Sequence, residues 1–400
     1  MTDYIKVSFG KWMTQVLSII FFIIGARYLD LNEYGIFGIL SVFIAISDYL
    51  SRETLESLIV SNKISLNSAI RIACEILFLT IVIISISYFI FEINKYYIIF
   101  LLTIFIFHWI SAPFKAKLIE LNLYVKYSYV YTLSSIISIF FGIISFELGY
   151  GVFSILLQQV ILNILLFISS YYFIFISKVS FGSFDRAEYK PFLKILPSSI
   201  IFVLSARLDV LIVSSYLGLT AAGLYTFCRR IFQIIQDFFI GGLDKLLLKS
   251  HIKISFKKFL IIHVTIFLIL YLMSIASLEL IPLILGQKWS NASEYLLLMV
   301  PGATYLTSIA LLRSKYVVEE RYTSLMKVRT IELVLSILLL IPIFFYSFLW
   351  VAAIYFSIRF FFISNIMTHH IFGYKFSFII TAFLIFLITY LTYSYTFQKI

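Results

Sequence analysis

The chain has 400 residues, of which 62% are hydrophobic and only 13% are charged, and its mean hydropathy is +1.03. This composition excludes an ordinary soluble domain and is typical of a polytopic membrane protein. A formal net charge of +11 would suggest a nucleic-acid partner in a soluble protein. Here the basic residues collect in the loops between apolar segments, as in the cytoplasmic loops of membrane proteins, so we expect no nucleic-acid partner.

Thirteen apolar segments approach the length of membrane-spanning helices, which need about 20 residues. In chain order they are 12–29, 34–58, 70–91, 97–114, 128–146, 152–177, 197–217, 221–243, 259–281, 295–313, 328–346, 348–368 and 376–396. The first is too long for the core of a signal peptide and lacks a convincing cleavage site, so we expect it to be a span. The sequence therefore predicts an all-α integral membrane protein with about 12–13 transmembrane helices.

The basic residues also set the expected orientation. With a cytoplasmic N-terminus, the inner loops hold twenty Lys and Arg, whereas the outer loops hold only Arg27, Lys95 and Lys288. Spans 1 to 6 and 7 to 12 then form two six-helix lobes of the same orientation. The predicted domains are an N-terminal lobe (1–177), a cytoplasmic linker (178–196), a C-terminal lobe (197–372) and an additional C-terminal helix (373–400).

A weak internal repeat supports this division. Tyr28–Phe37 (YLDLNEYGIF) aligns with Tyr216–Tyr225 (YLGLTAAGLY) at a constant offset of 188 residues, with four identities in ten positions. Each copy follows the first apolar span of its half. Repeated halves are typical of transporters whose substrate site lies between them.

Four arginines at the ends of spans are counted with the loops: Arg27 with the outer loops, and Arg71, Arg313 and Arg329 with the inner loops. The remaining basic residues inside the spans are all arginines: Arg52, Arg207, Arg229, Arg230 and Arg359. A charge at mid-membrane costs about 2.5–3.5 kcal/mol on insertion scales, so such side chains usually face a protein interior or a wet cavity. The guanidinium group binds phosphate or carboxylate through two parallel hydrogen bonds. We therefore predict a substrate site formed by Arg207, Asp209, Arg229, Arg230 and Arg359. In the alternative interpretation, each arginine pairs with a local carboxylate and holds helices together.

Other residues in the spans are candidates for coupling transport to an ion or for bending a helix. Asp48, Arg52 and Glu56 recur every four residues and would share one helix face, as a cavity lining or as a self-neutralising stripe. A carboxylate in a low-dielectric cavity can exchange protons near neutral pH. The ion-coupling candidates are Asp48, Arg52, Asp237 and Glu332, and the candidate hinge is Pro301 with Gly302, where we expect a kink or a break.

Signals for covalent chemistry are missing from the sequence. It has no P-loop and no H-E-x-x-H pattern, and both cysteines, Cys74 and Cys228, fall within predicted spans. The outer loops are too short to carry an enzyme domain. We therefore expect a transporter rather than an enzyme, with no metal and no cofactor.

Two stretches of the sequence resemble a known family. They are Gly25–Phe37 (GARYLDLNEYGIF) and Ser205–Tyr225 (SARLDVLIVSSYLGLTAAGLY), and they resemble the polysaccharide (O-antigen, Wzx-type) flippases of the multidrug/oligosaccharidyl-lipid/polysaccharide (MOP) exporter superfamily. The resemblance implies a two-lobed, MATE-like transporter of the bacterial inner membrane that works by alternating access. Its substrate would be an undecaprenyl-diphosphate-linked oligosaccharide.

The resemblance also implies partners and leaves alternatives open. Membrane lipids, H+ or Na+ as the coupling ion, a polysaccharide polymerase and a chain-length regulator are the candidate partners. The alternatives are a multidrug exporter of the same superfamily, which would favour carboxylates over arginines in its spans, and a membrane-embedded O-antigen polymerase, which would need a large external loop.

Overall fold

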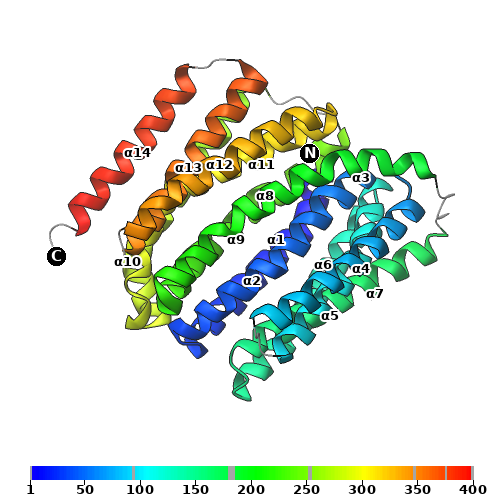
Figure 1. The fold of residues 1–400 in the computed structure, drawn as a ribbon, viewed down its shortest axis with the longest axis horizontal. Helices are drawn as coiled ribbons and strands as arrows, with labels where there is room; N and C mark the ends of the chain where they lie inside the picture. The colour runs from blue at the N-terminus through cyan, green and yellow to red at the C-terminus, as the bar shows by residue number, and fades with distance from the viewer. Residues whose placement is uncertain are drawn as a thin grey trace. The chain divides into compact units, whose positions relative to one another are not determined.

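The computed structural model describes residues 2–91, 95–178, 185–250, 255–345, 348–373 and 376–397, and their regular structure is entirely helical (Figure 1). In the N-terminal part, the elements are α1 (Thr2–Tyr28), α2 (Leu31–Ser51), the π-helical turn η1 (Arg52–Glu56), α3 (Ser57–Val60), α4 (Leu66–Phe91), α5 (Lys95–Glu120), α6 (Tyr124–Glu147) and α7 (Val152–Ile176). In the rest, they are the 3₁₀ turn η2 (Arg186–Glu188), α8 (Tyr189–Tyr216), α9 (Gly218–Ser250), α10 (Phe256–Leu285), the 3₁₀ turn η3 (Gln287–Trp289), α11 (Ala292–Val318), α12 (Tyr322–Phe345), α13 (Leu349–Phe372) and α14 (Phe376–Phe397).

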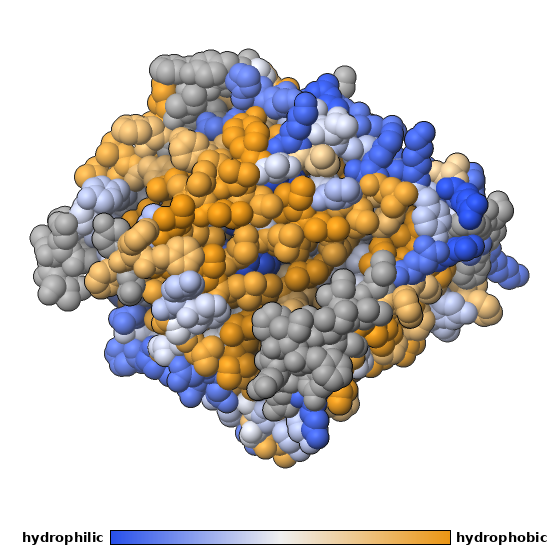
Figure 2. Space-filling model, in the orientation of Figure 1, coloured by the Kyte–Doolittle hydropathy of each residue, from blue (hydrophilic) through white to orange (hydrophobic). Residues whose placement is uncertain are grey.

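Each of the thirteen predicted apolar segments falls on one of these helical elements, with α2, η1 and α3 together forming the second. Among the described residues, eight helical segments are long and apolar enough to cross a membrane, and the longest are Leu31–Val60, Arg186–Tyr216 and Phe256–Leu285. The prediction of an all-α, polytopic membrane protein is confirmed. Large apolar side chains such as Leu283 and Phe345 are exposed, and Figure 2 shows one face on which apolar residues dominate. Such a surface suits contact with lipid.

Four helices end in the same tight motif, which keeps the connections short. The residues Asn62, Asn122, Gly149 and Glu320 have positive φ angles between 55° and 78° and follow helices α3, α5, α6 and α11. At α5, for example, Asn122 N donates to Ile119 O at 3.0 Å and Leu123 N donates to Leu118 O at 2.8 Å. These bonds satisfy the last carbonyl groups of the helix and turn the chain sharply.

The chain forms two compact units. Unit 1 comprises Met1–Leu29, Ile39–Val203 and Gly241–Ser250, and unit 2 comprises Asp30–Gly38, Leu204–Ile240 and His251–Ile400. In unit 1, α1 packs on α6, and α7 packs on both α5 and α6. In unit 2, α11 is the central helix, since it packs on α10, α12, α13 and α14.

Within unit 2, the two copies of the sequence repeat pack directly on each other. Gly35, near the start of α2, is so close to α9 that a Cβ atom on it would lie 2.1 Å from Leu219 O. Gly223, near the start of α9, is equally close to α2, since its Cβ would lie 2.1 Å from Leu31 O. Only glycine permits this approach. The two contacts are the same contact seen from either copy, because Gly35 and Leu31 correspond to Gly223 and Leu219 in the repeat.

The same correspondence extends to side chains. Thr220 Oγ1 donates a hydrogen bond of 2.7 Å to Asn32 Oδ1, and these residues are 188 positions apart. Gly38 faces its own counterpart, Thr226, and a Cβ on Gly38 would lie 2.4 Å from Thr226 Oγ1. The starts of α2 and α9 therefore cross around a local two-fold axis, which we call the glycine crossing.

Candidate functional site

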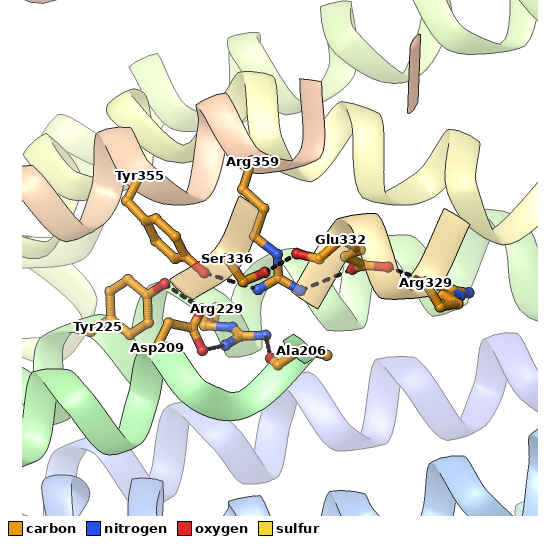
Figure 3. A network of polar contacts seen from close by, with 9 residues as sticks. All are labelled: Ala206, Asp209, Tyr225, Arg229, Arg329, Glu332, Ser336, Tyr355 and Arg359. Carbon is orange, nitrogen blue, oxygen red and sulfur yellow. Dashed lines mark hydrogen bonds and ion pairs between the residues drawn. The ribbon is translucent and has the colours of Figure 1, made fainter. Parts of the chain in front are cut away.

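A buried ion pair joins α8 to α9 in unit 2 (Figure 3). Asp209 is fully buried, and its Oδ1 atom lies 2.5 Å from Arg229 Nη1. Arg229 Nη2 also donates to Ala206 O at 2.9 Å, and the Tyr225 hydroxyl donates to Asp209 Oδ2 at 2.7 Å. Both carboxylate oxygens are thus occupied, as a buried charge requires. The Asp209 side chain thus points towards α9.

A second network joins α12 to α13 through one glutamate. Glu332 Oε2 lies 2.8 Å from Arg329 Nη1, and Glu332 Oε1 lies 2.9 Å from Arg359 Nη2. Arg359 Nη1 donates to the Tyr355 hydroxyl at 3.2 Å. The side chains of Glu332, Arg329 and Arg359 are at most 1% exposed. Glu332, predicted as an ion-coupling residue, therefore holds two arginines in the protein interior.

The two networks are neighbours, and together they carry an excess of positive charge. Tyr355, which accepts from Arg359, also interacts electrostatically with Asp209, and Figure 3 shows the two networks side by side. We refer to both together as the unit 2 network, whose charged members are Asp209, Arg229, Arg329, Glu332 and Arg359. It contains three arginines and two carboxylates, so its formal charge is +1.

Two other predicted arginines lie on the same helices. Arg207, on α8, is 9% exposed, and Arg230, on α9, is partly exposed. Arg230 Nη1 contacts Gln233 Oε1 at 3.4 Å. Of the five residues predicted for the substrate site, the structure thus joins Asp209 to Arg229 and brings Arg359 close to them.

The remaining ion-coupling candidates divide between the units. Asp48 lies in unit 1, where its Oδ1 atom is 3.4 Å from His108 Nε2 of α5. The Arg52 guanidinium lies 4.9 Å from the centre of the Tyr49 ring. Asp237 belongs to α9, but its side chain lies outside the described residues. Among the side chains that are described, no three His, Cys, Asp or Glu come together as a metal site.

The candidate hinge has a side chain inserted beside its backbone. Helix α11 continues through Pro301 and Gly302 without a break. The Ser357 hydroxyl of α13 donates to Leu298 O at 2.7 Å, and Gly302 N donates to the same hydroxyl at 3.2 Å. The hydroxyl therefore bridges a carbonyl and an amide one helical turn apart, an arrangement that accompanies bends in helices.

Several residues of these networks were missed by the sequence analysis. Tyr225, Tyr355 and Ser357 look like ordinary membrane-helix residues, and nothing in their spacing marks them. Arg329 was assigned to a cytoplasmic loop but lies three residues before Glu332 on α12, and this spacing is a usable signal for an intrahelical pair.

Solved structures of known transporters share this fold. An outward-facing multidrug resistance MATE family transporter of the MOP superfamily matches with a TM-score of 0.59 and 11% identity, over 98% of this chain and 95% of that one. The lipid II flippase MurJ, in an inward closed conformation, matches with a TM-score of 0.61 and 15% identity, over 98% and 92%. The Vibrio cholerae MATE transporter VcmN, in its bent form, matches with a TM-score of 0.58 and 11% identity, over 98% and 97%. No curated protein matches the sequence significantly.

The fold and its buried networks define a polytopic, all-α membrane protein with the architecture of MOP-superfamily transporters. The family model described as "Polysaccharide biosynthesis protein" matches residues 24–294. The chain belongs to this polysaccharide biosynthesis protein family. The expected resemblance to a polysaccharide family is confirmed by the family model, and the MATE-like fold that it implied is confirmed by the solved structures.

Proposed function

We propose that this protein is a flippase for an undecaprenyl-diphosphate-linked oligosaccharide, an O-antigen or a related polysaccharide repeat unit. It would move this lipid from the cytoplasmic to the periplasmic leaflet of the bacterial inner membrane by alternating access, with its N-terminus in the cytoplasm. The observation that carries the proposal is the positive excess of the unit 2 network in a member of a polysaccharide biosynthesis family. Membrane lipids surround it, and a polysaccharide polymerase and a chain-length regulator are the proposed protein partners.

The chemistry of the substrate explains why this charge is needed. A diphosphate cannot enter hydrocarbon without partners, since burial of an unpaired charge is prohibitive. Arg207 and Arg230, which retain some exposure, are the proposed contacts of the diphosphate. Arg229 and Arg359 are already engaged by carboxylates, so they contribute to the positive field of the site and fix the helices that present it.

The multidrug-exporter alternative has support from the MATE-like fold. An organic cation would need a carboxylate that is free to receive it. In unit 2, however, Asp209 and Glu332 are each held by arginine. The local charge thus favours an anionic head group over a cation.

Translocation in sealed vesicles tests the proposal. An undecaprenyl-diphosphate oligosaccharide is offered on one side, and its appearance on the other is followed for the wild type and for Arg207→Ala. We expect at least a tenfold loss of flux in the variant, because the diphosphate loses a charge-assisted contact. Arg71→Ala is the matched control, since Arg71 forms an exposed pair with Glu75 on α4.

Each outcome has a distinct meaning. Wild-type protein that moves none of several lipid-linked sugars refutes the flippase proposal, and transport of an organic cation instead would favour the multidrug exporter. If Arg207→Ala transports at the wild-type rate, Arg207 is not part of the binding site. Melting temperatures in detergent separate lost transport from lost folding.

A further inference from the structure

We propose that the start of α8 is fastened to α4 by a reversible latch, which must open for the protein to complete a transport cycle. The inference rests on the proposed transport function but concerns a different part of the chain, the predicted linker between the two halves of the sequence. The α4–α8 latch is the set of contacts between residues 185–189, at the start of η2 and α8, and residues 65–75, at the start of α4.

The latch acts on a helix that belongs to both units. Residues 189–203 of α8 are part of unit 1, and residues 204–216 are part of unit 2. In unit 2, α8 is fixed by Asp209, whose carboxylate pairs with Arg229 of α9. The contacts that hold the first turn of α8 in unit 1 are therefore continuous, through one helix, with the buried network of unit 2.

The first contact of the latch completes the N-terminus of α4. Ser65 is the N-cap of this helix, since its carbonyl accepts from Ala69 N at 3.0 Å and its hydroxyl accepts from Ser68 N at 3.3 Å. In a capping box, an acidic side chain three residues further on also binds the N–H of the N-cap, but here that position is Ser68. Glu188 supplies the carboxylate from 123 residues away, because its Oε2 accepts from Ser65 N and from Ser65 Oγ, each at 2.7 Å. Its negative charge also lies at the positive end of the α4 dipole.

Two further contacts extend the latch along α4. Asp185 N donates to Ser68 Oγ at 3.4 Å, and the Tyr189 hydroxyl donates to Glu75 Oε1 at 2.8 Å. Positions 65 and 75 are ten residues apart, so the latch covers about 15 Å of the helix. It is therefore a strap over several turns and not a single contact.

The two capped ends keep their caps when the latch opens. Without Glu188, the Ser65 hydroxyl still accepts from Ser68 N, and Ser68 Oγ lies 3.1 Å away as a second acceptor for its proton. On the other side, η2 has a cap of its own, since Asp185 Oδ1 accepts from Ala187 N at 2.8 Å. The latch can thus open without unfolding either end, as an element with two discrete states requires.

The tyrosine contact is reversible for the same reason. Glu75 already pairs with Arg71 on its own helix at 3.2 Å, so it keeps a partner when Tyr189 leaves. The Arg71 and Glu75 side chains are 58% and 51% exposed, and water can replace the bond to Tyr189. Exposed polar contacts of this kind contribute little to stability and open readily.

Release is needed because α8 is attached at both of its ends. While the latch is closed, the first turn of α8 stays with α4, and Asp209 holds the later part with α9. A rearrangement of the two units must then break one attachment or bend α8. Breaking the buried Asp209–Arg229 pair is costly, whereas the latch is exposed and its groups keep other partners. We therefore infer that the latch opens first.

A reversible disulfide tests whether the latch must open. Ser68→Cys and Asp185→Cys are combined with Cys74→Ser, because Cys74 is exposed on the same helix. Once mass spectrometry confirms the cross-link, we expect the flux of lipid-linked oligosaccharide in sealed vesicles to fall by about tenfold or more and to recover on reduction. Unchanged flux in the cross-linked protein would overturn the proposal and favour bending of α8 at Pro197, which lies inside this helix.

The matched control joins two helices that need not separate. Ser145→Cys with Ser154→Cys, also combined with Cys74→Ser, replaces a pair of hydroxyls on α6 and α7 whose oxygens lie 3.0 Å apart within unit 1. The oxidised control should transport as fast as its reduced form. Equal inhibition by both cross-links would show that any disulfide in unit 1 stops transport, and the latch would lose its support.

Hydrogen exchange in purified protein needs no substrate and separates this inference from the proposed function. The Ser65 and Asp185 amides are bonded across the latch, so both should exchange faster than amides in the interior of α4. We expect Glu188→Gln to speed both by about tenfold, because a charge-assisted hydrogen bond becomes a neutral one. Asp185 is the informative amide, since it bonds to Ser68 and responds only if the latch opens as a unit.

The control for exchange is Glu33→Gln, which changes a capping carboxylate at the start of α2 and should leave both amides unaffected. If the Asp185 amide responds to Glu188→Gln while the wild type moves no lipid-linked sugar, the latch stands and the flippase proposal fails. If flux is found but Glu188→Gln changes the Ser65 amide alone, the latch fails and the flippase proposal stands.

Discussion

The glycine crossing makes a quantitative prediction about Gly223→Ala. The new Cβ atom would lie 2.1 Å from Leu31 O, and real Cβ atoms are essentially never found within 3.0 Å of such a neighbour. The obstacle is a backbone carbonyl, so the helices must separate by about 1 Å. A gap of this size forfeits a quarter to a half of the dispersion energy at each contact. Overpacking of this kind lowers the free energy of unfolding by about 1–3 kcal/mol, and the higher helix propensity of alanine offsets at most about 1 kcal/mol of this loss.

We therefore expect Gly223→Ala to lower the midpoint of thermal unfolding in detergent. Gly35→Ala should lower it by a similar amount, because the corresponding distance, to Leu219 O, is also 2.1 Å. The double variant should cost less than the sum, since one separation relieves both clashes. The control is Gly25→Ala, where the nearest atom is the end of the Phe146 ring at 3.3 Å, which can give way. A Gly223→Ala protein as stable as the Gly25→Ala protein would refute the reasoning.

Two further changes test the buried networks of unit 2. Glu332→Gln removes the charge that balances two buried arginines, so it should destabilise the protein by about 3–5 kcal/mol. The control is Glu75→Gln, which changes an exposed pair and should cost less than about 1 kcal/mol. Chemical denaturation in detergent compares the stabilities of the two variants. Ser357→Ala removes the hydroxyl that bridges α11 and α13 and should cost about 1–3 kcal/mol, while equal stability of Ser357→Ala and wild type would show that the bridge is dispensable.

The spans could be predicted from the sequence because one physical requirement governs them. Every backbone group in a membrane must be satisfied internally, so each apolar segment of sufficient length becomes a helix. The positions of Pro301 and Gly302 were likewise visible, but the inserted Ser357 hydroxyl was not. Which polar side chain reaches a bent helix depends on packing between elements 55 residues apart in the chain.

The pairing of charges was only half predictable. The five arginines were expected to have polar partners in the spans, but the sequence left open whether these partners were substrate or carboxylate groups. For Arg229 and Arg359, the structure supplies carboxylates from other helices, at separations of 20 and 27 residues. The expected stripe of Asp48, Arg52 and Glu56 assumed an unbroken helix. The π-helical turn at Arg52–Glu56 changes that geometry, and no residue type in this segment predicts such a turn.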